Sequence, residues 1–104
     1  MSMTATLYLP HHFPQAVPTV GLVLPDPTTG LASVPDAVPT LLGCAPKLVD
    51  VLACGPSYVA YSIFDCEDEV NPTAMEAVAK VSGVSFDLGD EDATLCGAVL
   101  VVTK

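Results

Sequence analysis

Residues 48–65 read LVDVLACGPSYVAYSIFD, two runs rich in β-branched and aromatic residues that a Gly-Pro-Ser break separates. Such runs favour strands, and a short break with glycine and proline favours a turn. We therefore predict a β-hairpin with strands at Leu48–Cys54 and Tyr58–Asp65. Both faces of the first run are largely apolar, which is typical of a strand covered on two sides, so we expect this strand to be central in its sheet.

The clearest helix signal follows this hairpin. Asn71 is a suitable N-cap and Pro72 suits the first helical position, while residues 73–81 are mostly helix formers. Gly83 would end the helix. A helix of about ten residues needs a sheet to pack on. Its buried stripe would consist of Met75, Val78 and Ala79.

Two further strands are expected after this helix, at Val84–Leu88 and Leu95–Thr103. The second is the most apolar run of the chain, so we expect it at the centre of the core. Toward the N-terminus, Thr4–Leu9 and Thr19–Leu24 are short β-favouring runs. Each is followed by a proline, which cannot donate to a sheet ladder, so we expect both strands at an edge or at the end of the sheet.

The first 46 residues contain eight of the ten prolines. Closely spaced Pro and Gly forbid a long helix there and favour extended chain and turns, with one short helical turn at Asp36–Leu42. We predict a single domain over residues 1–104, with a Pro-rich extended or irregular half at 1–46 and a β-hairpin, helix, β-hairpin half at 47–104. The fold class is α+β, a small mixed or antiparallel sheet of about five to six strands with one main helix packed on it.

The charge balance excludes two classes of partner. Twelve carboxylates stand against three lysines and no arginine, which gives a formal net charge of −9. A protein that neutralises phosphates needs clustered Lys or Arg, so we expect neither direct nucleic-acid binding nor binding to an anionic membrane. The sequence also shows no secretory signal and no apolar run of roughly 20 residues. We therefore expect a cytoplasmic or virion-associated protein whose partner is another protein or a second copy.

Nine of the twelve carboxylates lie between Asp65 and Asp92. Two loops carry eight of these nine, and if both loops lie at one end of the sheet, the eight carboxylates form an acidic interaction surface. This surface would be solvated, would bind a cationic protein, or would hold a hard cation such as Ca²⁺. The spacing does not match a twelve-residue calcium loop, so we predict no metal site. The residues of the predicted acidic interaction surface are Asp65, Glu67, Asp68, Glu69, Asp87, Asp90, Glu91 and Asp92.

The Pro-rich half carries apolar side chains that a solvated linker would not need. We predict that it packs as an arm on its own domain or across a neighbouring subunit, because proline lowers the entropy that an extended segment loses on docking. The residues of this predicted assembly arm are Phe13, Leu31, Val34, Val38, Leu41 and Leu42.

Residues suited to catalysis are few. His11 and His12 are the only imidazoles, and adjacent side chains on an extended chain point in opposite directions, which disfavours a shared metal. The cysteines show no Cys-x-x-Cys pair, and we expect free thiols, with those in or beside strands behaving as small buried hydrophobes. No nucleophile elbow, phosphate loop or dinucleotide fingerprint is present. We predict no catalytic residue, no cofactor and no enzyme. The cysteines are Cys44, Cys54, Cys66 and Cys96.

These observations favour a non-enzymatic structural or interaction protein that self-assembles or decorates a larger protein assembly. A virion component, such as a phage capsid or tail accessory protein, fits this description, as does a small bacterial assembly subunit. One alternative is a small acidic inhibitor that mimics nucleic acid and blocks a host nuclease or defence complex. A second alternative is a small metal-dependent enzyme.

Overall fold

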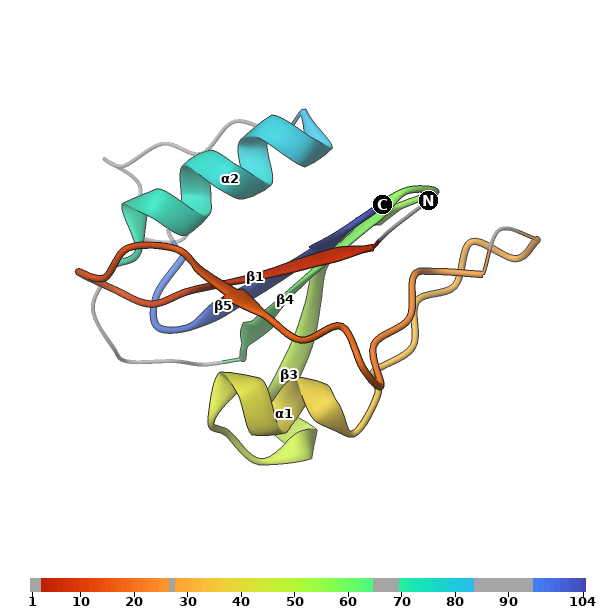
Figure 1. Ribbon diagram of the computed structural model, residues 1–104, viewed down its shortest axis with the longest axis horizontal. Helices are drawn as coiled ribbons and strands as arrows, with labels where there is room; N and C mark the ends of the chain where they lie inside the picture. Colours follow the sequence, from red (N-terminus) through yellow and green to blue (C-terminus); the bar gives the residue numbers. More distant parts are fainter. Residues whose placement is uncertain (1–2, 27, 65–69, 84–94) are drawn as a thin grey trace.

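The computed structural model describes residues 3–26, 28–64, 70–83 and 95–104. Within these ranges, five strands form one antiparallel sheet in the order β2-β1-β5-β4-β3. The helix α1 (Ala37–Leu42) lies against one face and the longer α2 (Pro72–Ser82) against the other, as Figure 1 shows. This is the expected α+β arrangement with one main helix on the sheet. The strands are β1 (Thr4–Tyr8), β2 (Gln15–Val17), β3 (Val49–Gly55), β4 (Tyr58–Ile63) and β5 (Val99–Thr103).

The closing strand β5 lies at the centre of the sheet, as predicted, between β1 and β4. Its side chains alternate between two cores, with Val99 and Val101 on the α2 side and Leu100 and Val102 on the α1 side. The strand begins at Val99 and not at Leu95 as expected. The reason lies at Gly97, whose φ of 70° is incompatible with extended strand backbone.

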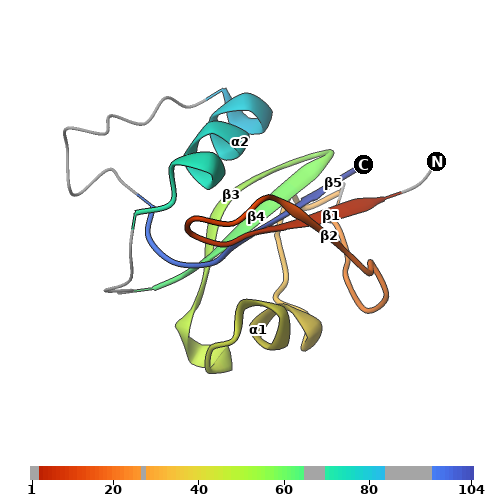
Figure 2. The same cartoon turned by 60° about the vertical axis from the view of Figure 1, so that its left-hand side comes forward.

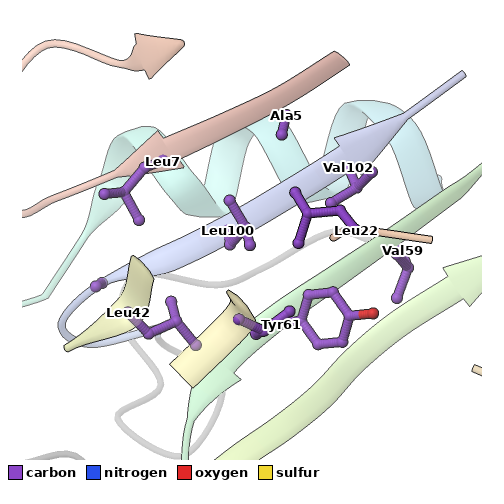
Figure 3. Packing of buried hydrophobic residues seen from close by; sticks show 10 residues of the cluster. Ala5, Leu7, Leu22, Leu42, Val59, Tyr61, Leu100 and Val102 are labelled. Carbon is purple, nitrogen blue, oxygen red and sulfur yellow. The ribbon is translucent and has the colours of Figure 1, made fainter. Parts of the chain in front are cut away.

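Each face of the sheet buries its own apolar cluster. On the α1 side the members come from α1, from the sheet and from the β2–α1 connection, and Figure 3 shows eight of them labelled. On the α2 side the cluster is smaller, with Met75 and Val78 of the helix resting on Ala60, Val99 and Val101 of the sheet. The buried residues on the α1 side are Ala5, Leu7, Leu22, Val38, Leu42, Val59, Tyr61, Ala98, Leu100 and Val102.

The hairpin of β3 and β4 forms as predicted, with Pro56 and Ser57 in its turn. The expectation that its first strand is central was wrong, because β3 is an edge strand. Its two apolar faces have another cause. Val49 and Val51 border the α1-side cluster, while Leu52 and Ala53 border the α2-side cluster. A shift in pairing between Val51 and Ala53 inserts Leu52 as a β-bulge residue. The bulge lets β3 contribute apolar side chains to the borders of both clusters.

The helix α2 begins and ends as the sequence predicts. The side chain of Asn71 accepts a hydrogen bond from the Ala74 N–H, and Gly83 ends the helix with a φ of 76°. The buried stripe differs from the prediction by one residue. Ala74, Met75 and Val78 are buried, whereas Ala79 is half-buried because the stripe faces the sheet slightly earlier in each turn.

The Pro-rich half differs from the prediction at two points, one where a predicted strand does not form and one where a strand forms instead. The strand predicted at Thr19–Leu24 does not form; a turn closes there, with Leu22 N–H donating to Thr19 O and Gly21 at a φ of 82°. The strand that forms is β2, three residues within the stretch expected to be extended. It pairs on the outside of β1, so β1 is internal and not an edge strand.

The short helical turn expected at Asp36–Leu42 appears as α1, and a 3-10 turn (Pro46–Leu48) leads from it into β3. Figure 2 shows α1 and α2 on opposite sides of the sheet with the long connection from β2 to α1 running past its edge. The strand predicted at Val84–Leu88 lies outside the described residues. Over the described ranges, none of the helices is long and apolar enough to cross a membrane.

Candidate functional site

The predicted acidic interaction surface lies outside the part of the chain that the structure describes. Its first four carboxylates fall within residues 65–69 and its other four within residues 84–94. Whether the two runs converge therefore stays a prediction. Cys66 also lies outside the described residues, so the expectation for its thiol stays a prediction.

The predicted assembly arm divides into buried and exposed residues. Val38 and Leu42 lie on the inner face of α1 and belong to the core, and Leu41 is half-buried. Val38 and Leu42 therefore cannot contact another molecule. Phe13 and Leu31, by contrast, are 91% and 72% exposed, and Val34 is also exposed.

Large apolar side chains are exposed in two groups. The first, which we call the sheet-end group, is Phe13, Phe64 and Val70. Phe13 follows β1 and Phe64 follows β4, and both of these strands end where they pair with Val99, so the two lie at one end of the sheet. Val70 immediately precedes Asn71, which is hydrogen-bonded to Tyr8 at that same end.

The second group, which we call the loop group, lies on the connection between β2 and α1. Its members are Val20, Val23, Leu31 and Val34. Leu24 and Ala32 of the same connection pack against the α1-side cluster, so the connection is held down while these four side chains face outward. Single exposed apolar residues are ordinary, but two groups on so small a chain are typical of contact surfaces.

A tyrosine hydrogen bond fixes the position of this connection. The hydroxyl of Tyr61, a residue buried beneath α1, donates to the backbone carbonyl of Ser33 at 2.7 Å. Burial raises the pKa of the Tyr61 hydroxyl above 10.0, and the nearby Cys54 adds to this by its negative charge when ionised. This bond attaches the connection to the core at Ser33, next to Val34 of the loop group.

Two hollows lie on the described surface, and neither assembles a catalytic set. An open depression of about 680 Å³ lies on the connection between β2 and α1. A smaller depression of about 250 Å³ lies between this connection and the β3–β4 turn. Asp26 is the one titratable residue in either lining, so neither offers a nucleophile with a base or a set of metal ligands. The larger depression is lined by Leu24, Pro25, Asp26, Thr29, Leu31, Ala32 and Ser33.

A buried asparagine joins three segments behind the sheet-end group. The Asn71 side-chain NH₂ donates to Tyr8 O at 3.0 Å and to Gly97 O at 2.8 Å, and the side-chain oxygen accepts from Ala74 N–H at 3.3 Å. Both the NH₂ group and the oxygen of this side chain are hydrogen-bonded. This explains how a polar side chain that is only 1% exposed is tolerated. Its role is therefore structural.

The two histidines and three of the cysteines lie within the described residues. His11 and His12 are both exposed, and His12 Nδ1 lies 2.7 Å from Pro10 O in the turn after β1. Cys44, Cys54 and Cys96 are not disulfide-bonded, and Cys54 is exposed, contrary to the expectation of burial, because β3 is an edge strand. In the described ranges no three His, Cys, Asp or Glu side chains gather as metal ligands would.

The outer edge of β3 is a feature that the sequence did not reveal. Phe64 N–H donates to Leu48 O at 2.6 Å, whereas the Leu48 N–H donates to Ala45 O at 2.9 Å. Because backbone groups alternate in direction along an antiparallel strand, Val49 and Val51 point theirs away from β4, and the Val49 N–H donates to Pro46 O. Two signals mark such an edge in the sequence, the prolines at 46 and 56 that bracket the strand.

Comparison of the chain with protein-family models, with curated proteins and with solved structures found no match. The function must therefore be inferred from the geometry alone.

Proposed function

We propose that this chain is a non-enzymatic interaction protein that self-assembles or attaches to a larger protein assembly. The exposed apolar side chains carry the proposal. Phe13, Val20 and Leu31 are each more than 70% exposed, although most of the large apolar residues in the described ranges pack in or against two buried clusters. Exposing a large apolar side chain to water costs about 1.5–3 kcal/mol relative to burying it. A partner surface would remove that cost.

Two observations support a contact function over catalysis. The exposed groups stand on elements that the core holds in place, so little conformational entropy is lost when they dock. The two depressions beside the β2–α1 connection, within the described ranges, have Asp26 as the one titratable residue of their linings. A virion or another repetitive assembly would supply many copies of one partner surface, which suits a small chain with two contact groups.

Self-assembly is tested by sedimentation velocity from about 1 to about 100 µM. We expect the natural chain to associate over this range and the Phe13→Ser, Leu31→Ser double variant to associate at least about tenfold more weakly, since two exposed apolar contacts are lost. The control is Gln15→Ser on the exposed face of β2, which should behave like the natural chain. A natural chain that is monomeric throughout contradicts self-assembly and leaves attachment to a different protein as the only form of the proposal.

A second candidate function rests on the charge. A formal net charge of −9 on 104 residues, with no arginine, would suit an acidic inhibitor that occupies the nucleic-acid site of a basic protein. We rank it second because its carboxylates are concentrated in two segments of the sequence, whereas the exposed apolar groups are distributed over the described surface.

A further inference from the structure

The larger depression, on the connection between β2 and α1, combines apolar walls with one carboxylate. Figure 1 shows this part of the connection projecting beyond the sheet. Leu31 in the lining is 72% exposed, and Asp26 is exposed beside it. Binding sites are typically apolar hollows in which a few polar groups fix the orientation of the ligand. The other apolar residues of the lining are Leu24, Pro25 and Ala32.

Hydrogen bonds within the connection hold this depression in shape. Asp26 N–H donates to Leu31 O at 3.0 Å, and Gly30 N–H donates to Asp26 O at 2.7 Å. The Asp26 carboxylate accepts from Thr28 N–H at 2.7 Å, and the Tyr61 hydroxyl attaches the far side of the depression to the core. Because these bonds position Asp26 and Leu31 before a partner arrives, little conformational entropy is lost on docking.

Backbone groups along one side of the depression are available to a partner. Within the described residues, the N–H groups of Ala32, Ser33 and Val34 donate to no protein acceptor. Val34 precedes Pro35, which favours extended backbone at Val34. An extended segment of another protein can bond to such groups through its main chain, as added strands do. These groups therefore favour a peptide segment as the occupant.

Charge restricts which segment can bind. The first 46 residues contain no lysine or arginine, and their carboxylates are Asp26 and Asp36. Both of these side chains are exposed, so the connection presents negative charge with no lysine or arginine beside it in the sequence. A segment that places a lysine or arginine beside Asp26 gains an opposite-charge contact. The connection of a second copy would bring further carboxylates instead, which disfavours it as the occupant.

We propose that the larger depression binds an extended segment of a basic partner protein, with an apolar side chain against Leu31 and an adjacent lysine or arginine beside Asp26. This inference rests on the proposed contact function, in its form of attachment to a different protein, and names the chemistry of the partner. The main chain of the segment bonds to the N–H groups of residues 32–34. The apolar side chain supplies burial, and the cation fixes the direction in which the segment lies.

A set of synthetic heptapeptides tests the proposal. Each peptide has valine, leucine or phenylalanine at its centre, a lysine on either side of it and threonines at both ends, and a matched set carries glutamate in place of lysine. The peptides are titrated into the natural chain, labelled at its N-terminal amine and held at about 0.1 µM, and binding is followed by thermophoresis. We expect at least one lysine peptide to bind with a Kd below about 1 mM, and its glutamate counterpart to bind at least about tenfold more weakly.

Variants of the chain locate the contact. Asp26→Asn should lower the ratio of lysine-peptide to glutamate-peptide affinity by about fivefold. Asp50→Asn removes the same charge from an exposed site on β3 outside the lining and should leave the ratio unchanged. Leu31→Ser should weaken binding of the lysine peptide by about tenfold, because apolar contact area is lost. Val20→Ser makes the matched change at an exposed residue outside the lining and should have no effect.

Amide NMR resonances report the backbone contact directly. The resonances of residues 32–34 should shift when the lysine peptide binds, because their N–H groups become hydrogen-bonded. Failure of every lysine peptide to bind, or binding that neither Asp26→Asn nor Leu31→Ser changes, would overturn this inference. Self-association of the natural chain in the sedimentation experiment would then leave the contact function standing. A chain that is monomeric throughout and also binds no peptide would count against both.

Discussion

At the scale of the residue, Asn71 does more than any other described polar side chain. It caps α2 and ties Tyr8 of β1 to Gly97 before β5, and its own backbone N–H donates to Leu95 O at 2.8 Å. The N-cap role was predictable because it depends on three neighbouring residues. The two carbonyl partners were not, because they lie 63 and 26 positions away along the chain.

Replacing Asn71 should therefore cost more than the loss of a helix cap. We expect Asn71→Ala to lower the free energy of unfolding by about 2–4 kcal/mol, since it removes the cap and leaves two carbonyls without their donor. Asn71→Asp keeps an acceptor for the cap but sets a carboxylate against the same two carbonyls, so it should cost at least as much. Urea unfolding followed by circular dichroism measures both. If Asn71→Asp were as stable as the natural chain, the junction would be unimportant.

Tyr61 links stability to alkaline pH. Burial raises the pKa of its hydroxyl above the 10.0 of an exposed tyrosine, so the folded state favours the protonated form. The stabilising contribution is then fully present below about pH 10 and is lost as the pH rises through the raised pKa, because the unfolded chain ionises first. Tyr61→Phe should lower the free energy of unfolding by about 1 kcal/mol at pH 7, because the bond to Ser33 is lost. Between pH 7 and about pH 11, this variant should lose less stability than the natural chain. Urea unfolding at the two pH values compares them, and equal alkaline losses would contradict this assignment.

At the scale of the element, local patterns predicted what local physics controls. The β3–β4 hairpin and α2 depend on turn residues, caps and periodicity within a few positions, and both form where expected. The placement of β3 at an edge and the choice of β2 over residues 19–24 depend on pairing between distant segments. An apolar strand bordered by two clusters has the same residue pattern as a central strand, so the sequence could not distinguish them.

The end of α2 gives a prediction at this scale. Gly83 has a φ of 76°, and a Cβ placed there would meet nothing within 4 Å, so the cost of a side chain is conformational only. Gly83→Ala should lower the free energy of unfolding by about 1 kcal/mol. Gly83→Asn should cost less, because asparagine tolerates the left-handed region. Thermal or urea unfolding of the two variants checks the order, and an inverted order would argue against a left-handed C-cap.

At the scale of the whole molecule, net charge opposes the apolar contacts. Two chains of −9 repel each other at long range, and salt screens this repulsion. Raising the salt concentration from about 50 to about 500 mM should therefore strengthen self-association, because the repulsion between the two acidic chains is screened. An acidic inhibitor bound to a basic protein would show the reverse, with affinity falling as salt rises. Sedimentation at both salt concentrations, with and without a nucleic-acid-binding protein, separates the two functions.

The central position of β5 also sets the order of events during synthesis. Because β5 lies between β1 and β4, the β1–β2 pair and the β3–β4 hairpin have no sheet contact until residues 99–103 leave the ribosome. The pairing of Thr4 with Thr103 has the largest sequence separation in the sheet, so it forms only after residues 99–103 are available. A nascent chain stalled before residue 99 would expose the inner edges of the β1–β2 and β3–β4 pairs at once, and unpaired strand edges favour aggregation.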